Sequence, residues 1–293
     1  MRIALAQFTT TADREANLEQ ALAAIDAAAA RGAHLVVFAE IVLDLFFPAE
    51  PAAAGALTST SSCARPAFAL AETIPGPTTE RLAAKARQHG IVIVFNLYEK
   101  DARGHTFDSS PVIDADGTLL GVTRMVHITD YEGFHEQDYY HPGDRGAPVY
   151  STRAGKIGVA ICYDRHYPEY LRGLALAGAE VICIPQAGCL GEWPEGLYEA
   201  EVQTAAFQNG CFLALCNRVG VEDKLTFAGE SFVADPDGRV IARAKTLEDD
   251  LLIVDLDLSQ IARSHAKKLF FRDRRPELYA AWVAPEVGQK EVD

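Results

Sequence analysis

The stretch that decides the fold runs from Lys156 to Tyr170 and reads KIGVAICYDRHYPEY. Its apolar run ends at Cys162, polar residues follow at once, and Pro168 opens an Ala- and Leu-rich segment typical of a helix. We interpret the stretch as a buried strand that delivers a thiol to the start of a helix. The helix N-terminus and the nearby Arg165 and His166 favour the thiolate, so Cys162 is a candidate nucleophile. A structural cysteine is the alternative, and it is the better interpretation for most of the six cysteines.

The segments on the N-terminal side repeat this pattern. Apolar runs bounded by turns alternate with helical patterns along the chain, which indicates a layered α/β protein. A helix is expected from about Asp13 to Ala30, with Gly32 as its stop, and the next strand, AHLVVFAE, ends in Glu40. Open α/β sheets place their sites where strands end, and desolvation there would raise the pKa of a carboxyl toward the range useful for proton transfer. A helix cap or a buried ion pair is the other interpretation of Glu40.

Turns and loops indicate how the strands are connected. The segment PGPTTERLAAKARQHG predicts a helix that ends at Gly90, and the turns DADG (114–117) and DPDG (235–238) predict two hairpins. The matching turns suggest two similar α/β halves that face one another. Residues 46–74 predict a long surface loop, either a lid over a site or a variable insertion. We expect one domain over residues 1–293, with a C-terminal tail from about residue 280.

Composition excludes several classes of protein. The formal net charge of -14 disfavours nucleic acid and anionic membranes as partners. The N-terminus does not have the pattern of a signal peptide, and no apolar run approaches the length of a membrane span, so a cytoplasmic location is expected. The cysteines show neither a CxxC pair nor zinc-ligand spacing. We therefore predict no disulfide framework, no metal site and no cofactor.

A family resemblance emerges from several segments taken in order. VVFAE, FHEQDYYHPGD, GVAICYD, QNG, NRVG, SFVADPDG and RDRRPELY together resemble the nitrilase superfamily of carbon-nitrogen hydrolases, from Arg2 to about Tyr279. The resemblance implies a four-layer αββα sandwich that pairs into a homodimer or larger homo-oligomer. It also implies a Glu-Lys-Cys triad with a second glutamate beside it. Glu40 matches the general base, Cys162 the nucleophile, and Glu136 the second glutamate.

One position departs from the family pattern. Members of the family usually read R-K-x-H followed by an aliphatic residue, whereas residues 124–128 read RMVHI, with Met125 at the position of the lysine. Strand alternation places Met125 and His127 on one face and Arg124 on the other, so Arg124 is not a simple substitute. Three explanations are open: His127, His135 or a backbone N–H replaces the ammonium; the protein is a degenerate binder; or Met125 is an introduced change that traps substrate.

The substrate class follows from a finer resemblance. The pair Arg165 and His166, the segment AAFQNG and the segment YYHPGDRGAPVY resemble N-carbamoyl amino acid amidohydrolases. This implies hydrolysis of a linear amide or N-carbamoyl compound through a Cys162 thioester; a non-catalytic small-molecule binder and a nitrilase are the alternatives. Arg165 suits a substrate carboxylate, and a surface position or an ion pair with Glu169 is equally compatible with the sequence. The predicted substrate contacts are Arg165, His166, His127 and His135.

Overall fold

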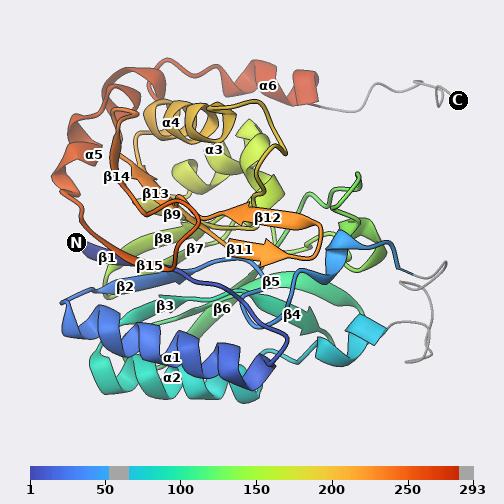
Figure 1. Ribbon diagram of the computed structural model, residues 1–293. Coiled ribbons are helices and arrows are strands. Elements are labelled where there is room, and N and C mark those ends of the chain that lie inside the picture. Colours follow the sequence, from blue (N-terminus) through green and yellow to red (C-terminus); the bar gives the residue numbers. More distant parts are fainter. Residues whose placement is uncertain (53–65, 284–293) are drawn as a thin grey trace, which may run out of the picture.

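Two β-sheets face one another in the computed structural model, which describes residues 1–52 and 66–283 (Figure 1). The first sheet has the order β15-β1-β2-β3-β5-β4, with β6 paired to β5. Strands β1, β2 and β3 are parallel, and the others run antiparallel to their neighbours. The bounds are β1 Arg2–Gln7, β2 Leu35–Phe38, β3 Val92–Val94, β4 Leu97–Lys100, β5 Thr106–Ile113, β6 Leu119–Arg124 and β15 Asp250–Asp255.

The second sheet repeats this plan. Its order is β14-β13-β10-β9-β8-β7, and β8, β9 and β10 are parallel. Its strands are β7 Val149–Thr152, β8 Gly155–Val159, β9 Val181–Gln186, β10 Phe212–Asn217, β13 Phe232–Ala234 and β14 Val240–Arg243. A separate hairpin is formed by β11 (Val219–Glu222) and β12 (Leu225–Ala228). Each sheet therefore has a parallel centre and an antiparallel hairpin, as the two matching turns suggested.

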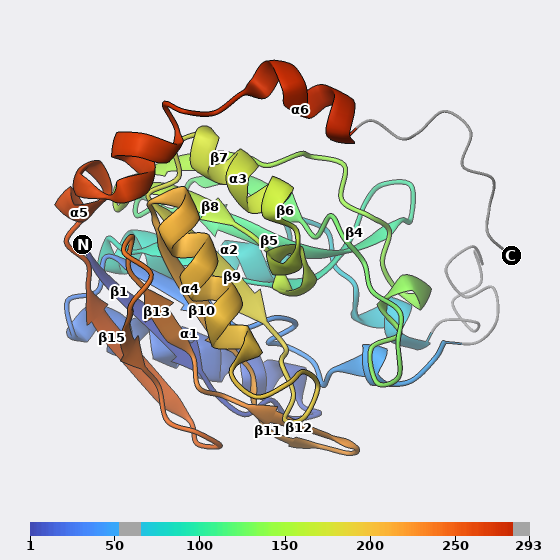
Figure 2. The same cartoon turned by 90° about the horizontal axis from the view of Figure 1, so that it is seen from above.

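Helices cover the outer face of each sheet. Helices α1 (Arg14–Ala30) and α2 (Pro77–His89) lie against the first sheet, and α3 (Pro168–Leu176) and α4 (Leu197–Asn209) lie against the second (Figures 1 and 2). The C-terminal part adds α5 (Ser259–Arg263) and α6 (Pro276–Val283). The layers are thus helix, sheet, sheet and helix, which confirms the predicted αββα sandwich.

The core between the sheets follows from strand alternation. Ile3 and Leu5 of β1 belong to the buried cluster between the two sheets, whereas Ala4 and Ala6 belong to the cluster under the helices. Phe212 of β10 enters the inter-sheet cluster from the other side and is 1% exposed. The small Ala4 and Ala6 leave room for a helix, while the larger residues fill the space between the sheets.

The predicted helix ends and turns match the structure. Asp13 caps α1 by accepting a hydrogen bond from the Ala16 N–H, and Gly90 ends α2 in the left-handed conformation that glycine adopts readily. The turns at 114–117 and 235–238 connect β5 to β6 and β13 to β14. No helix in residues 1–52 and 66–283 has the length and apolar character that a membrane crossing requires.

Two sequence predictions fall partly outside the described residues. The described ends of the expected 46–74 loop contain short 3₁₀ turns, Phe47–Ala49 and Pro66–Leu70, while residues 53–65 lie outside. Of the expected tail from about residue 280, α6 extends to Val283, and residues 284–293 lie outside. The single-domain assignment of residues 1–293 stays a prediction.

The packing of the two sheets can be tested at Phe212. Phe212→Ala should lower the free energy of unfolding by about 3–5 kcal/mol, because it leaves a cavity between the sheets. Urea denaturation measures this change. Val221→Ala, at a position 71% exposed, is the surface control and should change stability by about 0.5 kcal/mol or less. Equal effects of the two substitutions would contradict this account of the core.

Candidate active site

The candidate site lies where the parallel strands of both sheets end. Glu40 follows β2, Cys162 follows β8, and Gln186 is the last residue of β9. The two sheets touch here through the Glu40 N–H, which donates a hydrogen bond to the Gln186 carbonyl oxygen at 3.4 Å. Carboxyl ends of parallel strands are the usual site of function in open α/β sheets. The fold therefore brings a carboxyl from one sheet to a thiol from the other.

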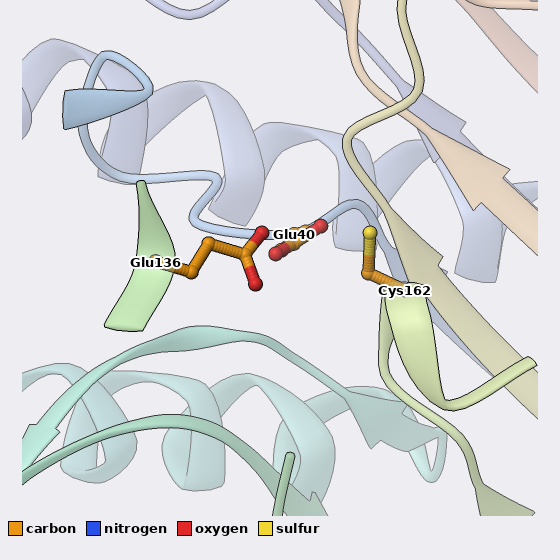
Figure 3. A group of neighbouring side chains, drawn as sticks. All are labelled: Glu40, Glu136 and Cys162. Carbon is orange, nitrogen blue, oxygen red and sulfur yellow. The ribbon is translucent and has the colours of Figure 1, made fainter. Parts of the chain in front are cut away.

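Three predicted residues form a buried cluster. The Cys162 Sγ and one carboxylate oxygen each from Glu40 and Glu136 lie within 4.8 Å of one another. The Glu40 carboxylate lies between the other two groups (Figure 3). Glu136 begins a 3₁₀ turn, Glu136–Asp138, and both glutamates are 0% exposed. The structure thus brings together residues that are distant in the sequence, and their catalytic roles stay predictions.

Arg218 and Asn96 hold the turn that carries Glu40. Arg218 Nη1 donates to the carbonyl oxygens of Glu40 at 2.9 Å and Ile41 at 2.6 Å, and Nη2 donates to the Asp44 carbonyl at 3.0 Å. The Asn96 Oδ1 accepts a hydrogen bond from the Ile41 N–H at 2.6 Å. Ile41 has φ 45°, a strained conformation for a β-branched residue, so the turn needs these contacts.

The turn at Cys162 is held by a second set of buried contacts. Cys162 has φ 42° and begins a 3₁₀ turn, Cys162–His166. Arg165 Nη1 donates to the Cys162 carbonyl oxygen at 3.1 Å and to Gln186 Oε1 at 2.9 Å, while Gln186 Nε2 donates to the Cys162 Sγ at 3.2 Å. Asp164 accepts from the Ile161 N–H at 3.3 Å. The sulfur is therefore positioned by its own turn and by the end of β9.

Sequence reasoning missed Asp108 as a member of this acidic group. Asp108 lies on β5, is 0% exposed, and accepts a hydrogen bond from Asn96 Nδ2 at 2.5 Å through Oδ1. Its carboxyl also lies within hydrogen-bonding reach of the Glu40 carboxyl. The alternation of Thr106, Asp108 and Ser110 on one face of a fully buried strand was the available signal. Gln186, Asn96 and Arg218 were likewise not singled out.

Burial raises the pKa of every acid in the group. Burial, and then repulsion from Glu136, raises the pKa of Glu40 to about 8. Burial is also the main cause that raises the pKa values of Asp108 and Glu136 well above the usual range, with Glu40 adding to the first and Asp108 to the second. Neither Glu40 oxygen makes a hydrogen bond of ordinary geometry to a described residue, although Asp108 and Cys162 lie close by.

The surroundings of Cys162 favour the thiol over the thiolate, contrary to the sequence expectation. Burial raises the pKa of Cys162 well above its usual range, and Glu40 and Glu136 add to the rise, while Arg165 opposes it. The Arg165 guanidinium contacts the Cys162 carbonyl oxygen and not the sulfur. Helix α3 begins only at Pro168, after the 3₁₀ turn, so Cys162 does not occupy its first turn. Desolvation outweighs the nearby cations.

Met125 lies in the interior. It is 0% exposed, belongs to the same buried cluster as Cys162, and donates its N–H to the Asp108 carbonyl at 3.0 Å. Strand β6 ends at Arg124, so the expected alternation does not extend to His127. Arg124 pairs with Glu99 through Nη2 at 2.6 Å, in line with the prediction that it is no substitute for a lysine. No lysine in residues 1–52 and 66–283 is buried, so none of them places an ammonium inside this cluster.

The predicted substrate contacts have other partners in this structure. The rings of His127 and His135 pair with Asp164 and Asp130 through Nδ1, at 2.7 Å and 3.1 Å, and the His127 ring also stacks on Tyr167. His166 Nδ1 pairs with Glu201 at 2.6 Å.

Arg165 is 4% exposed, and its Nε lies 3.3 Å from Oε2 of Glu201. It is therefore neither a surface residue nor paired with Glu169. Its hydrogen bonds support the backbone of the turn at Cys162. A substrate role for it and for the three histidines stays a prediction.

The same cluster bears on the metal prediction. One thiol and two carboxylates within 4.8 Å offer three donor atoms that a metal ion could bind. The donor set contains no imidazole, and a sulfur bound to a metal would not be free to act as a nucleophile. The expectation of no metal therefore stays a prediction.

Comparisons with known proteins identify the family. The family model for carbon-nitrogen hydrolase matches residues 2–266. An N-carbamoylputrescine amidase from Solanum lycopersicum is 34% identical, covering 94% of this chain and 93% of the relative, and a citrullinase from Francisella tularensis subsp. tularensis is 31% identical, covering 95% and 96%. The chain belongs to the carbon-nitrogen hydrolase family of the nitrilase superfamily.

Solved structures agree with this assignment. A carbon-nitrogen hydrolase from Helicobacter pylori G27 superposes with a TM-score of 0.84 at 29% identity, covering 97% of this chain and 98% of the other. A mutant of the amidase from Nesterenkonia sp. AN1, solved with the acetamide moiety of fluoroacetamide added covalently at its active site cysteine, gives a TM-score of 0.76 at 27% identity, with 97% of each chain covered.

The raised pKa of Glu40 predicts a stability that depends on pH. A native pKa of about 8, against an ordinary value of 4.5, means that the folded protein keeps a proton that the unfolded chain loses between these pH values. Stability is therefore lost as pH rises through this window. Glu40→Gln removes the ionisation, so its stability relative to the parent should grow by on the order of 2–4 kcal/mol between pH 5 and pH 9.

Urea denaturation at a series of pH values measures this difference. Glu169→Gln, on an exposed position of α3, removes the same charge from the surface and should give a difference that varies little with pH. A Glu40→Gln difference that stays constant from pH 5 to pH 9 would show that Glu40 does not hold its proton in the folded state.

Proposed function

We propose that this protein hydrolyses the carbon–nitrogen bond of a linear amide or N-carbamoyl compound through a thioester on Cys162. The observation that carries this proposal is the position of the Glu40 carboxylate between the Cys162 thiol and the Glu136 carboxylate (Figure 3). A buried carboxyl beside a thiol can take its proton as the sulfur attacks, and can return that proton to the departing nitrogen. Membership in the carbon-nitrogen hydrolase family supports the same chemistry.

The protonation states determine how the reaction starts. Because burial and the neighbouring carboxyls raise the pKa of Cys162, the resting nucleophile is a thiol and its proton must move during the attack. Glu40, with a pKa of about 8, is balanced near neutral pH between its proton-accepting and proton-donating forms. A water activated by Glu40 would then release the thioester. Glu136 keeps the pKa of Glu40 high through like-charge repulsion and orients the substrate.

The oxyanion is the weak point of this mechanism. Amide attack places negative charge on the carbonyl oxygen, and losing one donor to that oxygen costs about 10²–10³ in rate. Met125 offers no N–H from its side chain, and the rings of His127 and His135 pair with carboxylates. The Tyr140 hydroxyl is buried without a hydrogen-bond partner among the described residues. Burial raises its pKa, and the nearby Asp108 and Glu136 add to the rise. We assign Tyr140 as the donor to test first.

A non-catalytic binder is the second candidate function. The apolar Met125 side chain, fully buried in the cluster that contains Cys162, favours this candidate because it supplies no charge to the reaction. Hydrolysis of a nitrile through the same thiol is a further alternative that differs in substrate alone.

The substrate class remains part of the proposal. Two relatives carry the names N-carbamoylputrescine amidase and citrullinase, and both names refer to ureido compounds. An N-carbamoyl substrate is therefore the first to test, with Arg165, His166, His127 and His135 as candidate contacts. We also propose, from the sequence and the family resemblance, a cytoplasmic location and a homodimer or larger homo-oligomer.

Ammonia release tests the reaction directly. The protein should release ammonia from some member of a panel of linear amides, N-carbamoyl compounds and nitriles, and Cys162→Ala should abolish that release because the nucleophile is lost. Cys183→Ala is the matched control, because Cys183 is buried in the same core cluster but lies within strand β9 and not at a strand end. Equal rates of ammonia release by the parent and by Cys162→Ala would contradict the proposal. Intact mass after substrate exposure should show an adduct that Cys162→Ala lacks; neither turnover nor an adduct would favour the binder.

A further inference from the structure

Gln186 is a buried polar residue that contacts both the nucleophile and the candidate base. It is the last residue of β9 and is 0% exposed. Its backbone carbonyl oxygen accepts a hydrogen bond from the Glu40 N–H at 3.4 Å, and its side-chain Nε2 donates one to the Cys162 Sγ at 3.2 Å. A buried amide is costly unless its polar atoms are paired, so these contacts fix its position. Gln186 therefore joins the two groups that exchange a proton in the proposed reaction.

Arg165 determines which end of the Gln186 amide faces the sulfur. Arg165 Nη1 lies 2.9 Å from Gln186 Oε1 and 3.1 Å from the Cys162 carbonyl oxygen. A guanidinium carries only donors, so the amide atom that meets it must be the oxygen. Exchanging the two ends of the amide would set an N–H against a group that has no acceptor. The amide nitrogen therefore faces Cys162, where it can only donate.

The guanidinium of Arg165 also acts on the sulfur through its charge. It is buried, and its Nε and Nη2 make no hydrogen bond to a described residue, although Nε lies 3.3 Å from Glu201 Oε2. Arg165 opposes the rise in the pKa of Cys162 that burial and the glutamates cause. Hydrogen bonds that share a chain polarise one another, and a cation at one end strengthens the donor at the other end. Arg165 thus favours the thiolate directly and through the Gln186 amide.

The other polar neighbours of the sulfur are acids. Oxygens of Glu40 and Glu136 lie within 4.8 Å of the Cys162 Sγ. An ionised carboxyl can take the thiol proton, but its negative charge opposes the thiolate. Among the described residues, Gln186 provides the one hydrogen bond that is donated to this sulfur. The group that can offset the charge of the thiolate by direct contact is therefore the Gln186 amide.

We propose that Gln186 is a catalytic residue that stabilises the Cys162 thiolate, and that Arg165 is the positioning residue that orients it. The N–H already meets the sulfur in the resting site, so it need not reorient when the sulfur gains charge. A hydrogen bond to an ionised acceptor is stronger than one to a neutral acceptor. The contact therefore stabilises the thiolate more than the thiol or a thioester, which is the condition for accelerating a step.

The donor acts twice in the proposed function, on which this inference rests. Glu40 takes the thiol proton as the sulfur bonds to the substrate carbon, and returns that proton to the departing nitrogen when the C–N bond breaks. Water then gives a proton to Glu40 and adds to the thioester carbon. The C–S bond breaks with its electron pair on sulfur, and the proton on Glu40 returns to the thiolate. Gln186 stabilises the sulfur during the attack and again when the thiolate leaves.

Alkylation of Cys162 by iodoacetamide measures the thiolate without a substrate. The thiolate is the reacting form, so the alkylation rate follows the fraction of ionised sulfur. Two substitutions of similar size separate the roles of Gln186. Gln186→Met removes both side-chain contacts, whereas Gln186→Glu keeps an acceptor for Arg165 and places an oxygen against the sulfur. Peptide mass spectrometry at a series of pH values gives the rate at Cys162, and urea denaturation checks that each variant is folded.

Both substitutions should slow alkylation at each pH by about tenfold to a hundredfold, because a hydrogen bond to a charged group is lost. Gln186→Glu should be the slower of the two, because its carboxylate repels the thiolate. A residue that only supports the turn would give the reverse order, since Gln186→Glu retains the Arg165 contact that Gln186→Met loses. Gln208→Glu, at an exposed position of α4, is the control and should leave the rate unchanged.

Arg165→Met tests the positioning role. It should also slow alkylation of Cys162, because the Gln186 amide is no longer oriented and a nearby positive charge is lost. The double variant with Gln186→Met should lose less than the product of the two single losses, because the two residues act through one contact. Losses that multiply in full would show that Arg165 does not act through Gln186.

The outcomes separate this inference from the proposed function. Alkylation of Gln186→Met at the parent rate would overturn the inference, even if Gln186→Glu does not fold, and so would the reverse order of the two variants. Amide turnover that depends on Cys162, with parent alkylation rates in the Gln186 variants, would overturn the inference and leave the proposed function standing. The expected order of alkylation rates without turnover of any amide would support thiolate stabilisation by Gln186 and overturn the proposed function. The expected order together with turnover would support both.

Discussion

The buried guanidinium of Arg218 joins the two sheets at the point where the site forms. It follows β10 of the second sheet and donates to the carbonyl oxygens of Glu40, Ile41 and Asp44, in the turn that leaves the first sheet. Its charge is paired with Glu222. Removing either partner of a buried pair leaves an uncompensated charge, so such a group strongly constrains its surroundings. The position of Glu40 depends on this contact, because the turn itself has a strained backbone at Ile41.

The second constraint is the burial of several acids in one small volume. Glu40, Asp108 and Glu136 each have a raised pKa, mainly because of burial and then because of one another. Burial and the neighbouring glutamates also raise the pKa of the Cys162 thiol. Burial therefore favours the protonated forms of the three carboxyls, which would be ionised in water at neutral pH. This makes proton transfer between Cys162 and Glu40 possible, and it makes the site sensitive to the charge of whatever enters it.

Helix α3 and the strand after the DADG turn show where local sequence rules stopped being reliable. The apolar run at residues 156–162 and Pro168 correctly predicted a strand followed by a helix, but the 3₁₀ turn at Cys162–His166 separates the thiol from α3. Strand alternation was applied beyond Arg124, where β6 ends, so the relation between Met125 and His127 was not the expected one. In both cases a change of backbone direction altered what each side chain faces, and period-two or helix-dipole reasoning cannot detect such a change.

The family resemblance implied the αββα layers and singled out Glu136. The residues by themselves determined the alternation of strands and helices, the helix ends near Asp13 and at Gly90, the two hairpin turns, and the strand ends that carry Glu40 and Cys162. These features depend on apolar periodicity and on residues with strong local preferences, which act over a few neighbours. Only the tertiary structure decided that Asp108 joins the acids, that Arg165 and Arg218 are buried against the turns of Cys162 and Glu40, and that burial raises the pKa of the thiol. The reason is that burial and long-range charge contacts depend on which strand ends meet across two sheets. No local sequence pattern shows which strand ends lie together, although all the residues of the site are present in the sequence.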